Sequence, residues 1–293
     1  MLDIYTYPLF RPPAEASNLI LQVTYGCSYN NCSFCSMYKD KKFTIRKIEK
    51  IFKDIDRLVL NYPNTTKIFL ADGDALTLDT SMLVEILQYL NSSFKKLRRV
   101  SLYASAQNLL SKSEEELEIL YQNNLKLIYF GIETGDDIVL KKITKGVTKD
   151  DMIVALNKAA KANIKISATV ILGIAGVKYT SEHIKNTADI INKTQVTYLS
   201  TLQLGLEDDV VEKFYKNFND FIALNDLESL EEQKQFLKQL NPSNKVIFRS
   251  NHASNSLHLS GTLPKDKNRL LQELKSAEDI GVDALIPKHF RSF

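Results

Sequence analysis

Short apolar runs alternate with stretches of helical periodicity along most of the chain. The apolar runs are partly β-branched or aromatic and predict strands, whereas apolar residues at i, i+3 and i+4 predict amphipathic helices. The predicted strands cover residues 19–23, 68–71, 100–104, 127–130, 166–172 and 198–204. The predicted helices between them cover residues 45–60, 81–90, 113–123, 149–162 and 181–192.

This alternation of strand and helix, repeated six times, predicts a parallel sheet joined by crossover helices. We therefore expect an α/β protein in which residues 19–205 form a partial (βα)6 barrel of the TIM type, with a doubly wound sheet as the alternative. Residues 1–18 would form an N-terminal segment. Residues 206–293 would form a mainly helical C-terminal extension packed on the barrel, with helices at 210–223, 227–240 and 265–280 and a strand-like run at 246–248. In both architectures, functional residues follow the carboxyl ends of the strands.

The only three cysteines of the chain, Cys27, Cys32 and Cys35, follow the first predicted strand. Three thiolates on one loop can hold three corners of a cubane iron–sulfur cluster and leave the fourth iron open to a small molecule. A structural zinc site is the alternative, but it requires four ligands, and the nearest histidine in the sequence is His183. The cysteines therefore favour an iron–sulfur cluster with an open coordination position.

Composition and charge indicate which compartment, metal sites and partners we expect for this protein. A hydrophobic fraction of 44% and a charged fraction of 25% are typical of globular proteins, and no apolar run is long enough to span a bilayer. The first residues lack the pattern of a signal peptide, so we expect a cytoplasmic protein without a membrane partner. An odd number of cysteines in that reducing compartment favours metal binding over disulfides. The balance of 38 basic against 35 acidic residues disfavours nucleic acid as a partner.

Phe34 directly precedes the third cysteine, and the loop resembles the cluster motif of the radical S-adenosylmethionine (SAM) superfamily. Four residues separate Cys27 from Cys32, however, where that motif usually has three. The segment Ala71-Asp72-Gly73-Asp74 is similar to the family's Gly-Gly-Glu segment, which meets the methionine amino group. Gly131-Ile132-Glu133-Thr134-Gly135 resembles its Gly-x-Glu-Ser-Gly segment, and Ile171-Leu172-Gly173-Ile174-Ala175-Gly176 resembles its adenine-packing Ile-x-Gly-x-x-Gly segment. The likeness is nearest to elongator-type, methylthiotransferase-type and anaerobic coproporphyrinogen-oxidase-type enzymes.

The resemblance implies an enzyme with one [4Fe-4S] cluster on Cys27, Cys32 and Cys35 and with SAM as its second cofactor. An external one-electron donor such as a flavodoxin or ferredoxin would supply the electron that cleaves SAM and starts hydrogen abstraction. The residues implied in cofactor binding are Phe34, Asp72, Gly73, Asp74, Glu133, Ile171 and Gly173. From the residues alone, turn formation by the aspartates, core packing by Phe34 and relief of strand crowding by the glycines remain alternatives.

The segment 248–255 is the expected substrate contact, since planar and ionisable side chains are dense there. Arg249 suits a carboxylate or phosphate, and His252 could act as a general acid or base; Tyr38, Lys42 and Gln203 are further candidates. The alternative is a hydrogen-bonded turn that closes the barrel. Because one cluster uses every cysteine, an auxiliary cluster and hence sulfur insertion are disfavoured. Three functions stay open: radical SAM chemistry on an anionic small molecule, the same chemistry on RNA or another macromolecule, or a non-enzymatic zinc or iron–sulfur binding module.

Overall fold

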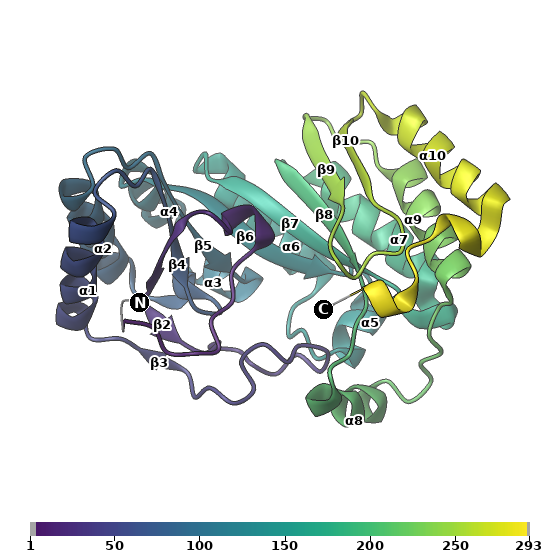
Figure 1. Cartoon of the computed structure of the whole chain (residues 1–293), viewed down its shortest axis with the longest axis horizontal. Coiled ribbons are helices and arrows are strands. Elements are labelled where there is room, and N and C mark those ends of the chain that lie inside the picture. The colour runs from purple at the N-terminus through teal and green to yellow at the C-terminus, as the bar shows by residue number, and fades with distance from the viewer. Residues whose placement is uncertain (1–3, 292–293) are drawn as a thin grey trace. The chain divides into compact units, whose positions relative to one another are not determined.

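The computed structural model describes residues 4–291, and Figure 1 follows the chain from purple near the N-terminus to yellow near the C-terminus. The chain divides into two compact units. The first unit comprises the residues up to Asn30 together with Cys35–Phe130 and Lys158–Ile166. The second comprises Asn31–Phe34, Gly131–Asn157 and the residues from Ser167 onward. The chain therefore passes from one unit to the other inside the cysteine loop, and each unit is described by itself.

Parallel strands form the sheet of the first unit. They are β1 (Leu19–Gln22), β4 (Lys67–Ala71), β5 (Arg99–Ala104) and the beginning of β6 (Leu125–Glu133). Leu21 pairs with Leu70, and Leu70 pairs with Leu102, so consecutive strands along the chain are neighbours in the sheet. Both faces of these strands are covered, which explains why their sequences read as apolar runs without alternation.

Helices cover this sheet. They are α1 (Ile48–Asn61), α2 (Thr80–Ser93), α3 (Ala106–Ser111) and α4 (Glu114–Gln122). In Figure 1, α1 and α2 lie side by side, and the two helices are in contact. Ile51, Ile55 and Leu58 of α1 are buried because they recur on one face at helical spacing. Short 3-10 turns at Pro13–Glu15 and Ala75–Thr77 complete the unit.

The second unit continues with parallel strands and adds one antiparallel strand. β7 (Lys165–Leu172), β8 (Tyr198–Gln203) and β9 (Val246–Ser250) are parallel neighbours, whereas β10 (Leu259–Leu263) is antiparallel to β9. The helices of this unit are α5 (Asp137–Lys142), α6 (Lys149–Lys161, which ends in the first unit), α7 (Gly176–Lys193), α8 (Asp208–Asn217), α9 (Asp226–Gln239) and α10 (Lys267–Ile280). Single turns follow at Gly281–Ala284 and Lys288–Phe290. In Figure 1, α7, α9 and α10 lie together beside the green and yellow strands, and α9 contacts both of the other helices.

The predicted α/β class with parallel strands is confirmed, and each of the six predicted strands exists. Several bounds differ from the prediction for local reasons. The first predicted helix begins at Ile48 instead of 45, because Thr44 and Ile45 pair with β2 (Thr24–Tyr25) as β3 (Thr44–Ile45). The C-terminal extension contains the helices expected there, but its two strands β9 and β10 extend the sheet, and β10 carried no sequence signal that predicted it.

No helix in the described part of the chain is both long enough and apolar enough to cross a membrane.

Candidate functional site

The cysteine loop is closed at its base by the short ribbon of β2 and β3, in which Thr24 pairs with Ile45. Cys27, Cys32 and Cys35 are half-buried thiols at the carboxyl end of the first strand region. No three His, Cys, Asp or Glu side chains within residues 4–291 are arranged around a single metal ion. A cubane cluster differs from such an ion because each thiolate binds a different iron, and three soft sulfur donors are the ligand type that it requires.

Asp74 binds the backbone beside Cys27. Its Oδ1 accepts a hydrogen bond from the Ser28 amide at 2.9 Å, and its Oδ2 accepts from the Ser28 hydroxyl and from Asn108 Nδ2. Burial raises the pKa of Asp74 above its usual range. Burial and then the charge of Asp74 raise the pKa of the Cys27 thiol to about 11. The Cys27 thiol is therefore protonated at neutral pH, and a bound metal would have to displace that proton.

Gly73 lies directly against the cysteine loop, and its amide donates to the Gly26 carbonyl at 3.1 Å. A Cβ atom at position 73 would lie 2.7 Å from the Cβ of Cys27, so only glycine fits between the turn and the loop. The position needs glycine for close approach of the two backbones, and this approach sets the place of Cys27.

Asp72 lies in a buried polar network rather than on an open surface. Its Oδ2 accepts from Gln22 Nε2 at 3.1 Å, from the Gly26 amide at 3.1 Å and from Lys41 Nζ at 3.0 Å. Its Oδ1 and the buried hydroxyl of Tyr38 have no hydrogen-bond partner among the described residues. The segment 72–74 thus holds the cysteine loop through each of its three residues. The orphaned Oδ1, an acceptor, matches the need of a cationic ammonium group for a carboxylate.

The four residues between Cys27 and Cys32 carry two sets of anchors. In the first unit, Asn30 has a positive φ of 33°, and its side chain donates to the Tyr38 carbonyl at 2.7 Å. In the second unit, the Asn31 carbonyl accepts from Thr144 Oγ1 at 2.6 Å and from Lys213 Nζ at 2.9 Å. The longer gap therefore contains an Asn–Asn pair in which each residue is fixed by its own contacts.

Glu133, at the end of β6, has a left-handed backbone with φ of 60°. Its Oε1 forms an ion pair with Lys145 Nζ at 3.0 Å, and Lys145 Nζ lies 5.9 Å from the ring centroid of Phe34. A Cβ atom at Gly131 would overlap Glu133 Oε1, so the glycine leaves room for the carboxylate to fold back over the strand. The structure therefore brings together Glu133 and Phe34, and Lys145 joins them although no sequence motif indicated a separate role for it.

The next residues of the same segment attach it to α7. The Gly135 amide donates to Thr187 Oγ1 at 2.8 Å, and the Thr134 hydroxyl lies 2.8 Å from His183 Nδ1. Burial lowers the pKa of His183 to about 4, so its imidazole is neutral. Thr134 and Gly135 therefore have structural tasks, because their contacts hold the segment against α7.

Ile171 and Gly173 lie at the end of β7. Ile171 and Phe34 both pack, partly buried, against one hydrophobic cluster of the second unit. The members of this cluster are Val139, Ile143, Ile174, Ala175, Phe214, Phe218 and Phe221. Gly173 has a positive φ of 80°, and its amide donates to Glu232 Oε2 at 2.6 Å. Phe34 and Ile171 thus each offer partly buried apolar surface, the kind of surface that an adenine requires.

The predicted substrate residues lie around the end of β9. Arg249 is exposed, and its guanidinium donates to the Phe248 carbonyl at 2.7 Å. His252 Nδ1 accepts from the Ser254 amide at 3.2 Å, and burial lowers the pKa of His252. Asn255 bonds the Thr201 carbonyl at 2.8 Å and accepts from the Gln203 amide at 2.8 Å. The segment therefore contains the hydrogen-bonded turn that was the alternative interpretation, with Arg249 and His252 at its sides.

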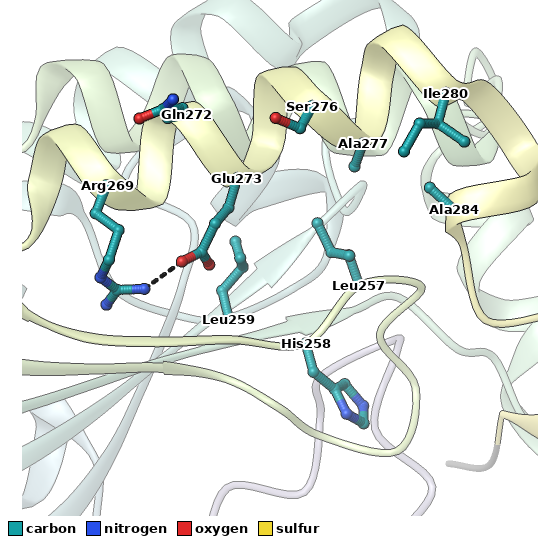
Figure 2. Close-up of a pocket in the computed structure, with 10 residues that line it drawn as sticks. All are labelled: Leu257, His258, Leu259, Arg269, Gln272, Glu273, Ser276, Ala277, Ile280 and Ala284. Carbon is teal, nitrogen blue, oxygen red and sulfur yellow. Dashed lines mark hydrogen bonds and ion pairs between the residues drawn. The ribbon is translucent and has the colours of Figure 1, made fainter.

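A separate pocket of about 470 Å³ lies between α10 and the segment 257–259 (Figure 2). Leu257 and Leu259 point toward α10, whereas Arg269 and Glu273 on that helix form an ion pair. None of its lining residues is among the residues that the sequence predicts for the site.

The sequence profile of the Radical SAM superfamily matches residues 21–191, which is more than half of the chain. The heme chaperone HemW of Bacillus subtilis is 23% identical over 150 residues, a stretch that covers 51% of this chain and 39% of that protein. A probable threonylcarbamoyladenosine tRNA methylthiotransferase of Methanocaldococcus jannaschii is 24% identical over 234 residues, covering 75% of this chain and 52% of that protein. The chain thus spans about half, or less, of the length of these relatives.

Among solved structures, coproporphyrinogen III oxidase HemN of Escherichia coli, a radical SAM enzyme, superposes with a TM-score of 0.57 at 12% identity. The superposition covers 76% of this chain and 52% of HemN. At this identity the likeness shows the fold alone, and it confirms the predicted partial barrel of the TIM type.

Proposed function

We propose that this chain, which belongs to the radical SAM superfamily, cleaves SAM reductively at one [4Fe-4S] cluster. The radical that forms would abstract hydrogen from an anionic small molecule. Enzymes of this family use a [4Fe-4S] cluster and SAM, and the chain is an enzyme of that kind. The observation that carries the proposal is the cysteine loop held by Asp72, Gly73 and Asp74 at the ends of β1 and β4. Family membership also removes the non-enzymatic binding module from the open alternatives.

Each predicted residue has a task in this proposal. Cys27, Cys32 and Cys35 would hold the cluster, which with SAM supplies one-electron carbon–sulfur cleavage and a hydrogen-abstracting radical. Asp72 and Asp74 fix the loop, and the orphaned Oδ1 of Asp72 would accept from the methionine ammonium group. Glu133, held by Lys145, would accept from the ribose hydroxyls. Phe34 and Ile171 would cover the adenine, and Gly173 would let the adenine approach the turn after β7.

The substrate and partners are proposed on separate grounds. Arg249 would bind a carboxylate or phosphate, and His252, with Nδ1 occupied by Ser254, would exchange a proton through Nε2. A flavodoxin or ferredoxin would deliver the electron in the cytoplasm. RNA is a second candidate substrate, favoured by the relative whose name states a tRNA methylthiotransferase.

The test is anaerobic reconstitution with iron and sulfide, followed by reduction and measurement of 5′-deoxyadenosine. We expect cluster absorbance and SAM cleavage in the wild type and loss of both in Cys27→Ala, Cys32→Ala and Cys35→Ala. Ser33→Ala is the matched control, because the buried Ser33 hydroxyl lies between two cysteines and has no hydrogen-bond partner in the described structure. A wild-type protein without cluster or cleavage would refute the function. If RNA copurifies with the protein and is released by salt, the proposed substrate would be a macromolecule instead of a small molecule.

A further inference from the structure

A buried carboxylate from α9 holds the turn that follows β7. The Gly173 amide donates to Glu232 Oε2 at 2.6 Å, and Thr180 Oγ1 donates to Glu232 Oε1 at 2.7 Å. The Glu232 side chain is buried, with only 3% of the residue exposed. Glu232 lies outside residues 21–191, and no motif in the sequence indicates it.

The C-terminal extension also holds the other end of this turn. The Gly176 amide donates to the Gly173 carbonyl at 3.0 Å, and the Val177 amide donates to the Ile222 carbonyl at 2.9 Å. A Cβ atom at Gly176 would lie 2.7 Å from the Ile222 carbonyl oxygen, so the chain after α8 lies tightly against the turn. Residues of the extension thus fix the turn at Gly173 and again at Gly176 and Val177.

A carboxyl group is a destabilising choice for a purely structural contact at this position. Burial raises the pKa of Glu232 to about 7, because its ionised form has lost water and receives only two hydrogen bonds in exchange. A glutamine would keep an oxygen for the Gly173 amide without a buried charge. The contact that matters is therefore the acceptor oxygen for the Gly173 amide, which a glutamine would also supply.

We propose that Glu232 is a positioning residue for cofactor binding: by fixing the Gly173 amide, it holds the β7 turn in the conformation that receives the adenosyl group of SAM. This inference rests on the proposed function, in which Ile171 and Gly173 meet the adenine. It makes α9 part of the frame of the cofactor site, although the proposal places no residue of α9 in contact with SAM.

The experiment compares wild type, Glu232→Ala, Glu232→Gln and Thr180→Val as reconstituted holoenzymes. For each protein, the Kd of SAM, the iron content, the melting temperature and the steady-state parameters KM and kcat for SAM cleavage are measured. We expect Glu232→Ala to raise Kd and KM for SAM about tenfold, with iron content and kcat unchanged. Glu232→Gln should bind SAM like the wild type, because its amide oxygen can accept from Gly173. Thr180→Val is the control for stability, since it removes a bond to the same carboxylate and leaves the Gly173 bond intact.

The outcomes separate the two proposals. If the wild type binds SAM and Glu232→Ala binds it equally well, the positioning role is wrong while the function stands. If SAM affinity falls with the melting temperature in Thr180→Val as well, the residue is merely structural and the inference is again refuted. A wild type that binds no SAM refutes both. Should Glu232→Ala fail to fold, Glu232→Asp replaces it, because its shorter side chain draws the carboxylate away from the Gly173 amide.

Discussion

Gly131 and Gly135 stand four residues apart in the same segment but meet very different neighbours. A Cβ atom at Gly131 would overlap the carboxylate tip of Glu133, a flexible group. A Cβ atom at Gly135 would overlap the Asn186 carbonyl oxygen, which belongs to the backbone of α7. Gly131 leaves room for the Glu133 side chain. Gly135 allows β6 and the turn after it to pack against α7.

We therefore predict that Gly131→Ala folds with little loss of stability but binds SAM about tenfold more weakly, because Glu133 must move. Gly135→Ala is the matched control and should lower the melting temperature strongly, because the Asn186 carbonyl of α7 cannot move aside as a flexible side chain can. Thermal unfolding and the Kd of SAM check both variants. Equal stability of the two proteins would contradict this account.

The pH dependence of stability at Glu232 gives a second prediction. Its pKa rises from 4.5 to about 7 on folding because of burial. Between these values the folded protein holds a proton that the unfolded chain has released, so stability falls as pH rises through this window. Glu232→Gln should remove this loss and stabilise the protein by up to roughly 3 kcal/mol above pH 7, with no gain near pH 4. Unfolding in urea across the pH range measures the difference, and a constant difference at all pH values would contradict it.

At the scale of elements, a buried ion pair adds to the hydrogen bonds that join the cysteine loop to the sheet. Lys41 Nζ lies 3.0 Å from Asp72 Oδ2 and also donates to the carbonyl of Thr6 at 2.8 Å, so it links the loop to β4 and to the N-terminal segment. The side chains of Lys41 and Asp72 are 7% and 0% exposed. Removal of one partner would leave a charge buried without compensation.

Lys41→Met should thus destabilise the protein by about 3 kcal/mol and reduce cluster incorporation. The double variant Lys41→Met with Asp72→Asn should recover part of this loss, because it removes the uncompensated charge. The control is Lys161→Met, which breaks the exposed ion pair with Glu114 and should change stability far less, because solvent screens that pair. Urea unfolding of the wild type, of Lys41→Met, of Asp72→Asn and of the double variant gives the coupling energy. If the double variant were less stable than Lys41→Met, an uncompensated charge would not explain the loss.

At the scale of the whole molecule, the C-terminal extension completes a core that the barrel segments begin. Val139, Ile143 and Ile174 come from the barrel region, whereas Phe214 and Phe218 come from the extension. All five are fully buried in one hydrophobic cluster. Neither part can bury this cluster alone, which agrees with an extension that packs on the barrel.

A chain truncated after residue 205 should therefore be insoluble or should aggregate, since it exposes the apolar face of α5 and of the β7 turn. Size-exclusion chromatography and the soluble fraction on expression measure this outcome. Truncation after residue 265, which retains α9 and the cluster, is the matched control and should remain more soluble. A folded, monomeric 1–205 fragment would show that the extension is dispensable for the core.

Local sequence pattern was enough to establish the order of strands and helices, the three cysteines and the segments around Asp74, Glu133 and Gly173. These features are local, because apolar periodicity and motif spacing are written within a few neighbouring residues. Even the family could be inferred in this way, and the match to residues 21–191 confirmed it. The strand β10 escaped prediction because Leu-Ser-Gly-Thr-Leu contains a glycine and too few apolar residues for a clear alternation.

Only the tertiary structure shows which side chains hold these motifs in place. Lys145 meets Glu133, Lys41 meets Asp72 across 31 positions, and Glu232 meets Gly173 across 59 positions. In the sequence, Glu232 is one acidic residue among several in an ordinary helix, and Asp72 could equally have formed a turn. Such pairings depend on how distant elements pack, and packing is set by the whole fold rather than by local pattern. The motifs were therefore predictable, while the residues that hold them in place were not.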